Sequence, residues 1–310
     1  MRYKNILVLG GGGFVGRHLV AALAARGARV TVPARRRERV KHLVLLPTVD
    51  VVECDVNRRE VLSTLVAGRD AMINLVGVLH GPDFAASHVE LPQAALAACR
   101  EHGIRRVLHM SALGASLDAP SDYLRSKGAG ERAVLAGADL DATVFRPSAI
   151  FGPEDAFLNL FATLAKLMPV LLLACQDARF QPIYVRDVAR VMVDALDESS
   201  SFGRAYDLCG PKVYTLRELV ETVCRLTGRR RLVLGLPDSL STLQALLLEL
   251  APGEPLMTRD NLRSMRIPSV CDCSLPFGVV PQQLEALAPA WLGPGGPRQR
   301  YPVFRWRARR

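Results

Sequence analysis

The stretch Ile6-Leu7-Val8-Leu9-Gly10-Gly11-Gly12-Gly13-Phe14-Val15-Gly16 decides the fold of the N-terminal half. Its apolar start predicts a buried strand, and the apolar residues after it recur at helical spacing. Between them, Gly10, Gly13 and Gly16 form Gly-x-x-Gly-x-x-Gly. Such glycines allow a tight turn, let backbone N–H groups approach a pyrophosphate, and let the helix pack closely. We predict dinucleotide binding here, with Phe14 and Val15 beside the turn. A flexible turn without a ligand is the alternative.

Strands and helices alternate through the rest of the first half. Strands are predicted at Asn5–Leu9, Arg29–Pro33, Val49–Glu53, Ala71–Leu75, Arg106–Met110 and Ala142–Arg146. Helices are predicted at Val15–Arg26, Ser87–Glu101 and Tyr123–Ala136. This alternation indicates right-handed crossovers and a doubly wound parallel sheet flanked by helices. We therefore expect an α/β Rossmann domain over residues 1–150.

The second half is less regular, and we interpret residues 151–310 as a smaller, mostly helical lobe. Segments near 179–210, including a strand at Ala205–Leu208, are expected to return to the sheet. Asp187 is expected to cap one helix, and Thr215 with Glu218 forms a capping box for another. The helices are predicted at Phe157–Met168, Val188–Leu196, Leu216–Leu226 and Leu240–Leu250. From about residue 293 we expect an irregular basic tail.

Composition narrows the function classes. The 310 residues carry a net charge of +10 and are 49% hydrophobic, which is typical of a globular protein. No apolar run is long enough to span a membrane, and no signal peptide is visible. The basic charge has no nucleic-acid-binding motif with it, so we expect no nucleic-acid partner. The Cys271-Asp272-Cys273 pair is interpreted as plain thiols without a metal, in a reducing, cytoplasmic setting.

The end of the second predicted strand indicates which dinucleotide binds. An NAD site usually has a carboxylate there to hold the ribose 2′-hydroxyl. This chain has no acid at that point and continues with Arg35 and Arg36. Guanidinium groups pair with a 2′-phosphate, often through two hydrogen bonds. We therefore favour NADP(H) over NAD(H), although a solvated basic start to the next helix would look the same.

Tyr123 and Lys127 form a Tyr-x-x-x-Lys pair at the start of a predicted helix, and a separation of four places both on one face. A free tyrosine has a pKa of about 10, and a nearby ammonium lowers it toward the range of a useful base. The same ammonium can hold the nicotinamide ribose. Ser111 ends the preceding strand and could polarise a substrate carbonyl. The alternative is a surface Tyr and Lys, with Ser111 capping a turn.

Taken together, the sequence resembles the extended and atypical short-chain dehydrogenases/reductases, the superfamily of the NAD-dependent epimerases and dehydratases. The resemblance runs from Asn5 to about Thr227. The segments that carry it, besides the glycine turn, are Cys54-Asp55-Val56, Asn74-Leu75-Val76-Gly77, His109-Met110-Ser111-Ala112, Tyr123-Leu124-Arg125-Ser126-Lys127, residues 145–153 (FRPSAIFGP) and Tyr184-Val185-Arg186-Asp187-Val188-Ala189.

Several roles are implied by this resemblance alone. Asp55 and Val56 should meet the adenine. Leu75, Val76 and Gly77 should line the cofactor groove. The residues beside the nicotinamide should be Arg146, Pro147 and Ser148. Within the superfamily the chain looks most similar to bacterial relatives of the NAD(P)H-binding accessory subunit of respiratory complex I.

Three functions remain open. The first is an NADP(H)-dependent oxidoreductase with Tyr123 as acid/base, Lys127 as its activator and Ser111 as polariser. The second is a nucleoside-diphosphate-sugar epimerase or dehydratase, against which the apolar stretch 157–175 argues. The third is a cofactor-bound structural or assembly protein without turnover. Sugar-nucleotide relatives carry a Ser/Thr-rich run where this chain has Met110-Ser111-Ala112-Leu113-Gly114, which puts turnover in doubt.

Partners follow from the same reasoning. We expect a nicotinamide dinucleotide and a small-molecule substrate whose identity the sequence leaves open, as it does the oligomeric state. The complex I resemblance adds the hypothesis of peripheral contact with the inner membrane or a respiratory complex. The mixture of Arg and aromatic residues in the tail would suit an anionic surface, but a tail folded on its own domain or without structure is the preferred interpretation.

Overall fold

The computed structural model describes residues 2–81, 83–250, 253 and 255–293, so the basic tail lies outside the described residues. The chain forms two compact units. Unit 1 comprises residues 1–147, 185–208 and 272–280, and unit 2 comprises 148–184, 209–271 and 281–310. Each unit is described by itself.

Unit 1 is built on one seven-stranded parallel sheet. Its strand order is β11 (Arg204–Leu208), β6 (Asp141–Pro147), β5 (Arg106–Met110), β4 (Ala71–Asn74), β1 (Asn5–Leu9), β2 (Arg29–Ala34) and β3 (Val49–Glu53). The order reverses at β1, whose neighbours are β2 on one side and β4 on the other. This confirms the predicted Rossmann fold, in which ligands bind beyond the carboxyl ends of the strands at such a reversal.

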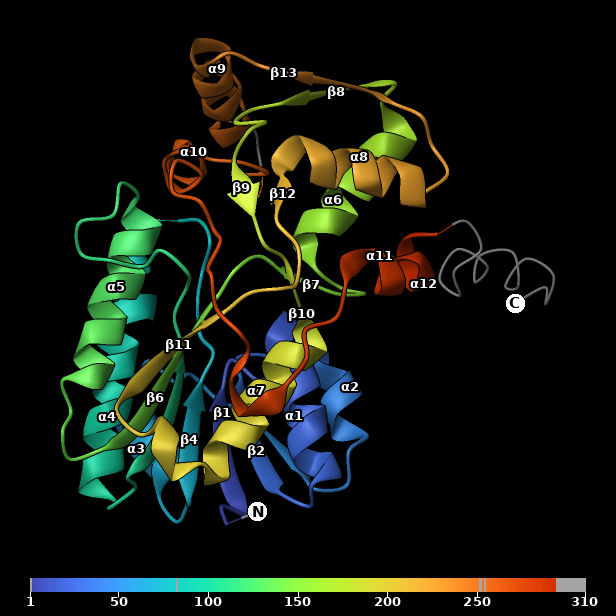
Figure 1. The fold of residues 1–310 in the computed structure, drawn as a ribbon. Coiled ribbons are helices and arrows are strands. Elements are labelled where there is room, and N and C mark those ends of the chain that lie inside the picture. The colour runs from blue at the N-terminus through green and yellow to red at the C-terminus, as the bar shows by residue number, and fades with distance from the viewer. Residues whose placement is uncertain (1, 82, 251–252, 254, 294–310) are drawn as a thin grey trace. The chain divides into compact units, whose positions relative to one another are not determined.

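Helices cover both faces of this sheet (Figure 1). One face carries α3 (Arg59–Val66), α4 (Leu91–Glu101) and α5 (Asp122–Leu135). The other carries α1 (Phe14–Ala25) and α7 (Val185–Asp197), with the short α2 (Lys41–Val44) after β2. Because both faces are covered, the central strands are buried, and Ile6, Leu7, Val8 and Leu9 of β1 are all fully buried.

A buried arginine explains how residues 185–208 return to unit 1. The side chain of Arg106, on β5, is 1% exposed. Its guanidinium donates to the carbonyl oxygen of Leu196 at 3.2 Å and to Ser201 Oγ at 2.9 Å. It also donates to the carbonyl oxygen of Asp141 at 2.6 Å. A buried charge needs such partners, so Arg106 joins the end of α7 to the sheet.

Unit 2 is smaller and mixes helices with short strand pairs. Its helices are α6 (Ala156–Leu167), α8 (Leu216–Leu226), α9 (Asp238–Glu249), α10 (Arg259–Ser264), α11 (Leu284–Leu287) and α12 (Pro289–Leu292). Its strands pair as β8 (Val170–Leu173) with β13 (Leu232–Gly235), β9 (Arg179–Phe180) with β12 (Tyr214–Thr215), and β7 (Ile150–Phe151) with β10 (Ile183–Tyr184). The prediction of a mostly helical lobe missed these strands, because most of them are only two residues long.

Three local predictions can be checked. The capping box of α8 is confirmed, since Thr215 Oγ1 accepts from the N–H of Glu218 and Glu218 Oε2 accepts from that of Thr215. The predicted cap at Asp187 is wrong: α7 begins at Val185, directly after β10, so Asp187 lies in its first turn. The prediction of free thiols at 271 and 273 is also wrong, because Cys271 and Cys273 are disulfide-bonded. None of the described helices is long and apolar enough to cross a membrane.

Candidate functional site

The glycine turn follows β1 and abuts the segment after β4. Gly10 has a φ of +76°, which glycine adopts without the strain of a side chain. A Cβ there would lie 3.0 Å from both the carbonyl carbon of Leu75 and the nitrogen of Val76. The backbone N–H of Leu75 donates to Leu9 O at 2.9 Å. The turn and the predicted cofactor groove at 75–77 are therefore adjacent.

The start of α1 is arranged for an anion. A Cβ at Gly16 would overlap the backbone of Gly10 and lie 2.6 Å from Gly11, so only glycine lets α1 pack this closely. Gly13 is the N-cap, no side chain caps the helix, and no acidic residue lies in its first turn. The first N–H groups and the positive end of the helix dipole thus suit a phosphate group between Gly13 and Phe14–Val15.

The residues predicted to choose the dinucleotide lie at the carboxyl ends of β2 and β3. Arg35 and Arg36 directly follow β2 and are exposed, and neither guanidinium has an ion-pair or hydrogen-bond partner within the described part of the chain. Glu53, at the end of β3, accepts from the backbone N–H of Arg37 at 2.9 Å. The loop that carries the two arginines is thereby tied to β3, while their side chains stay available.

Asp55 and Val56 follow β3 on the same edge of the sheet. Asp55 is exposed, and its Oδ1 accepts from the N–H of Asn57 at 3.1 Å, which closes a short turn. Val56 is half-buried and packs against the apolar core beneath α3 and α4. The turn presents the backbone of 55–56 at the end of β3.

Lys127 is buried at the centre of the site, with a side chain that is 5% exposed. Its Nζ donates to the carbonyl oxygen of Met110 at 3.1 Å. A Cβ at Gly77 would lie 2.9 Å from the same nitrogen. The ammonium therefore lies against the segment after β4 and against the end of β5. Tyr123 lies one turn earlier on α5.

Ser111 directly follows β5 and is buried. Its backbone N–H donates to Phe145 O at 2.8 Å. Its hydroxyl Oγ has no hydrogen-bond partner within the described chain. An unpartnered buried hydroxyl is unfavourable unless another group binds it, so Ser111 is suited to hold a ligand oxygen.

Burial controls the protonation of the Tyr–Lys pair. It raises the pKa of Tyr123 to about 12 and lowers the pKa of Lys127 to about 8. In both cases transfer out of water disfavours the charged form. The Tyr-x-x-x-Lys spacing predicted the opposite direction for the pKa of Tyr123, because the ammonium was expected to face the phenol. In the structure Lys127 donates to Met110 instead. At neutral pH Tyr123 holds its proton, which suits it to donate one.

Sequence reasoning missed His88, which connects the segment after β4 to helix α5. It lies in a turn of π-helix at Ala86–Glu90, before α4, and is 1% exposed. Its Nε2 accepts from the N–H of Val78 at 3.0 Å. Its Nδ1 therefore carries the proton and donates to Ser126 Oγ at 2.8 Å, and that hydroxyl donates to Tyr123 O at 2.8 Å.

Burial, with a smaller contribution from the charge of Lys127, lowers the pKa of His88 to about 3. The ring is thus neutral and keeps this tautomer at neutral pH. Its centroid lies 5.6 Å from that of the Tyr123 ring. His88 therefore positions both the 77–78 segment and Tyr123. Nothing in the sequence around it indicates this, since the predicted helix simply ran through it.

The predicted nicotinamide-end residues are engaged with protein groups. Arg146 donates to the buried carboxylate of Glu131 at 2.9 Å and pairs with Asp207 at 3.5 Å, and the bond to Glu131 raises its pKa. Pro147 O accepts from the N–H of Leu113 at 3.0 Å. Ser148 is the first residue of unit 2, where its hydroxyl donates to Ser269 O at 2.7 Å.

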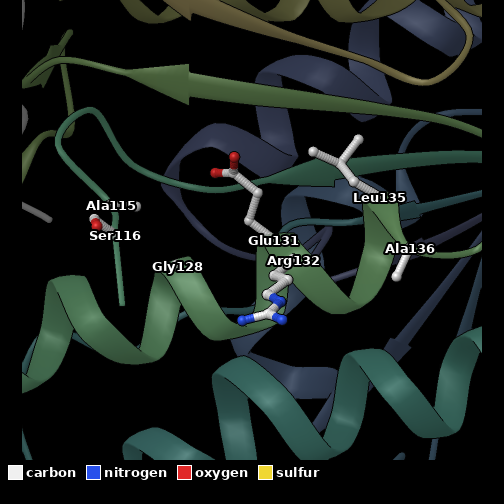
Figure 2. Close-up of a pocket in the computed structure, with 7 residues that line it drawn as sticks. All are labelled: Ala115, Ser116, Gly128, Glu131, Arg132, Leu135 and Ala136. Atoms are coloured by element: carbon white, nitrogen blue, oxygen red, sulfur yellow. The ribbon is translucent and has the colours of Figure 1, made fainter. Parts of the chain in front are cut away.

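A cavity of about 470 Å³ lies beside α5 but contains none of the predicted site residues. Figure 2 shows it between the loop at Ala115–Ser116 and the helix, with the carboxylate of Glu131 and the guanidinium of Arg132 pointing in different directions. A Cβ at Gly128 would lie 2.6 Å from Ser116, so this helix and loop touch. The predicted dinucleotide-binding residues of unit 1 lie instead mainly in the loops at the carboxyl ends of β1 to β5.

Comparison with known proteins identifies the family of the chain. The model of the NAD dependent epimerase/dehydratase family matches residues 6–209. NADH dehydrogenase [ubiquinone] 1 alpha subcomplex subunit 9 of Mus musculus is 32% identical, with 96% of this chain and 81% of that protein covered. The ceramide reductase of Caulobacter vibrioides is 34% identical, with 75% of this chain and 74% of that protein covered.

A solved structure shows the same fold. The UDP-glucuronic acid 4-epimerase of Bacillus cereus, in complex with UDP-glucuronic acid and NAD, superposes with a TM-score of 0.65. It is 18% identical, and the match covers 85% of this chain and 100% of that one. The superfamily resemblance noted in the sequence is thereby confirmed, including its likeness to the complex I subunit.

Proposed function

The chain belongs to the NAD dependent epimerase/dehydratase family, and on that premise we propose that it is an NADP(H)-dependent oxidoreductase that interconverts a carbonyl and a hydroxyl group of a small molecule. The observation that carries the proposal is the buried Lys127, which lies against Gly77 and the end of β5, one turn after Tyr123. A buried lysine is unfavourable for stability, and perturbed groups of this kind cluster at functional sites.

The roles follow from the protonation states. A nicotinamide held beside Lys127 and Gly77 would supply or accept the hydride. Tyr123, protonated at neutral pH, donates its proton to the carbonyl oxygen during reduction and takes it back during oxidation. Ser111 Oγ, which has no hydrogen-bond partner among the described residues, donates a hydrogen bond to the same oxygen. Lys127 holds the ribose and stabilises the phenolate that forms when Tyr123 gives up its proton.

The choice of dinucleotide rests on Arg35 and Arg36. We expect nucleotide released from purified protein to be NADP(H), and stripped protein to bind NADPH more tightly than NADH. In the variant Arg35→Ser/Arg36→Ser, loss of the charge-assisted bonds to a 2′-phosphate should weaken NADPH binding by about 10- to 100-fold. NADH binding should change little. Equal losses for both nucleotides, or tighter NADH binding by wild type, would overturn the NADP(H) preference.

Turnover is tested with Tyr123→Phe, which keeps the ring and removes the proton donor. We expect wild type to oxidise NADPH with a carbonyl compound from a panel of aldehydes, ketones and oxidised lipids. The variant should bind NADPH normally and react about 100- to 10,000-fold more slowly. Equal rates for wild type and variant would remove Tyr123 from the mechanism.

Two alternatives have support of their own. The likeness to a complex I subunit favours a cofactor-bound protein without turnover; in that case NADPH would be retained, and no substrate would oxidise it. The likeness to a sugar-nucleotide epimerase structure is one of fold alone. That activity would appear as product isomers formed without net oxidation of the nucleotide.

The location is part of the proposal. We propose a cytoplasmic protein that contacts the inner membrane or a respiratory complex peripherally. The support is the name of the mouse relative, a mitochondrial NADH dehydrogenase subunit. Cell fractionation, with and without a high-salt wash of the membranes, would distinguish a free protein from a peripherally bound one.

A further inference from the structure

The strand pair β8–β13 in unit 2 is apolar on both faces. One face carries Leu171, Leu173 and Val233, which are buried against α6 and α8. On the other face Leu172 pairs with Leu234, and Val170 with Leu232. A parallel sheet normally has both faces covered, but here Leu172 is 47% and Leu232 57% exposed.

Helix α9 exposes leucines where a surface helix normally exposes charge. It buries the small residues Ser241 and Ala245, while Leu243 is 50% and Leu247 61% exposed. Its only charged residues are one at each end, and Glu249 is bonded to Arg259. Gln244 Nε2 donates to Leu172 O at 3.4 Å, so α9 lies beside β8.

We name these exposed side chains the leucine surface. Its members are Leu172, Leu232, Leu234, Leu240, Leu243, Leu246, Leu247 and Leu250. The exposed large apolar residues of unit 1 come instead from separate segments with at most two neighbours in sequence, as at Val44 and Leu45, Leu79 and Leu117. Scattered exposed leucines are ordinary, whereas a group of this size marks an interaction site.

Basic residues lie at one end of the leucine surface, where β8 and β13 begin. Arg229, Arg230 and Lys166 are exposed there. Two hydrogen bonds join the segments that carry these basic residues. Arg231 Nε donates to Ala165 O at 2.8 Å, and the N–H of Leu232 donates to Pro169 O at 3.3 Å. The same end exposes Leu167 and Met168. The exposed acids Asp177 and Asp238 follow the opposite ends of the strands.

We propose that the leucine surface docks on an anionic lipid bilayer. Exposed leucines can enter the boundary between headgroups and acyl chains, while adjacent arginine and lysine side chains reach the phosphates. The charge complementarity of this basic end selects a lipid surface as the occupant. The inference stands apart from the dinucleotide reaction, because every residue in it belongs to unit 2.

The first test is co-sedimentation of the full chain with vesicles. We expect binding to phosphatidylcholine–phosphatidylglycerol vesicles, weaker binding to phosphatidylcholine alone, and loss of binding in high salt. Leu243→Gln/Leu247→Gln should weaken binding about tenfold or more, because each removes a side chain that would enter the lipid. Arg229→Gln/Arg230→Gln should weaken it about fivefold per arginine, and only with anionic vesicles.

The matched control is Leu45→Gln/Leu117→Gln, which removes two exposed leucines from unit 1 and should bind as wild type. All variants should keep the wild-type melting temperature, because the altered side chains are exposed. Depth is measured separately: a tryptophan at Leu247→Trp should be quenched by lipids brominated in their acyl chains, and one at Leu45→Trp should not.

Several results would overturn the proposal. One is absence of sedimentation with anionic vesicles. Another is unchanged binding by Leu243→Gln/Leu247→Gln, which would place the contact elsewhere, as in the basic tail. A third is a wild-type protein that does not bind vesicles but self-associates, with a self-association that Leu243→Gln/Leu247→Gln abolishes. The occupant of the leucine surface would then be a second copy of the chain.

Discussion

Replacement of Lys127 by methionine is expected to abolish turnover and, at the same time, to stabilise the protein. Burial lowers the pKa of Lys127 from 10.5 to about 8. A tenfold change in a protonation equilibrium corresponds to about 1.4 kcal/mol, so the charged form costs the folded state on the order of 3 kcal/mol at neutral pH. Loss of the bond to Met110 O offsets about 1 kcal/mol of the gain. We expect a net increase of about 2 kcal/mol in the free energy of unfolding.

The pH dependence of stability independently gives the sign of the stability change in Lys127→Met. Between pH of about 8 and 10.5 the unfolded chain holds the Lys127 proton and the folded chain does not. Wild-type stability therefore receives a contribution that rises with pH across this window, and Lys127→Met lacks it. The stability advantage of the variant should be full below pH 8 and should vanish above about pH 10.5. Urea unfolding of both proteins across this range measures it.

Lys41→Met serves as the control, because the Lys41 side chain is 75% exposed and its removal should change stability by less than about 0.5 kcal/mol. Turnover should fall in Lys127→Met as in Tyr123→Phe. A Lys127→Met protein that is less stable than wild type at pH 7 would show that the lysine is held by favourable contacts. The site would then not be the strained one that the proposed function requires.

Substitution of Gly16 by alanine should destroy dinucleotide binding by displacing α1. The new Cβ would lie 2.6 Å from Gly11 and overlap the Gly10 backbone, and backbone cannot move aside as a flexible side chain can. We expect a loss of about 1–3 kcal/mol in stability from this overpacking. Because the turn and the helix N-terminus would separate, affinity for NADPH should fall about 100-fold or more.

Gly13→Ala separates the two effects. Gly13 has a φ of −74°, which alanine adopts freely, and its Cβ would meet only Gly10 O at 3.3 Å. Its stability should stay near that of wild type, while the added methyl group should obstruct the pyrophosphate. Thermal unfolding and NADPH titration of both variants test this. Normal NADPH binding by Gly13→Ala would place the phosphates away from this turn.

Much of the fold was visible in the amino-acid sequence. The strand, glycine turn and helix at 5–25 were predicted to within a residue, as were β3 and β5. These elements can be predicted from the sequence because their apolar periodicity, and the glycines that end them, depend on only a few neighbouring residues. The same alternation, with right-handed parallel crossovers, predicted a doubly wound parallel sheet, whereas the order of its seven strands came from the structure. Where spacing was ambiguous, as at the start of α7, the helix boundary was misplaced.

Most of the predicted site residues lie at the carboxyl ends of the strands, because motif and strand end coincide in the chain, and their roles stay predictions. Their physical state was not visible. Whether Lys127 is buried depends on Met110 and Gly77, 17 and 50 positions away in the chain, and burial reversed the predicted pKa direction of Tyr123. His88 acquires its role only when Val78 and Ser126 meet its two nitrogens.

The sequence by its local patterns thus determined the Rossmann topology, the glycine turn and the Tyr–Lys pair. Burial, tautomer and exposed surface came from the folded chain, because each depends on contacts between residues far apart in sequence. The leucines of α9 illustrate the difference. Their spacing predicts a helix with an apolar face, but only the packing shows that Ala245 is turned inward and Leu247 outward.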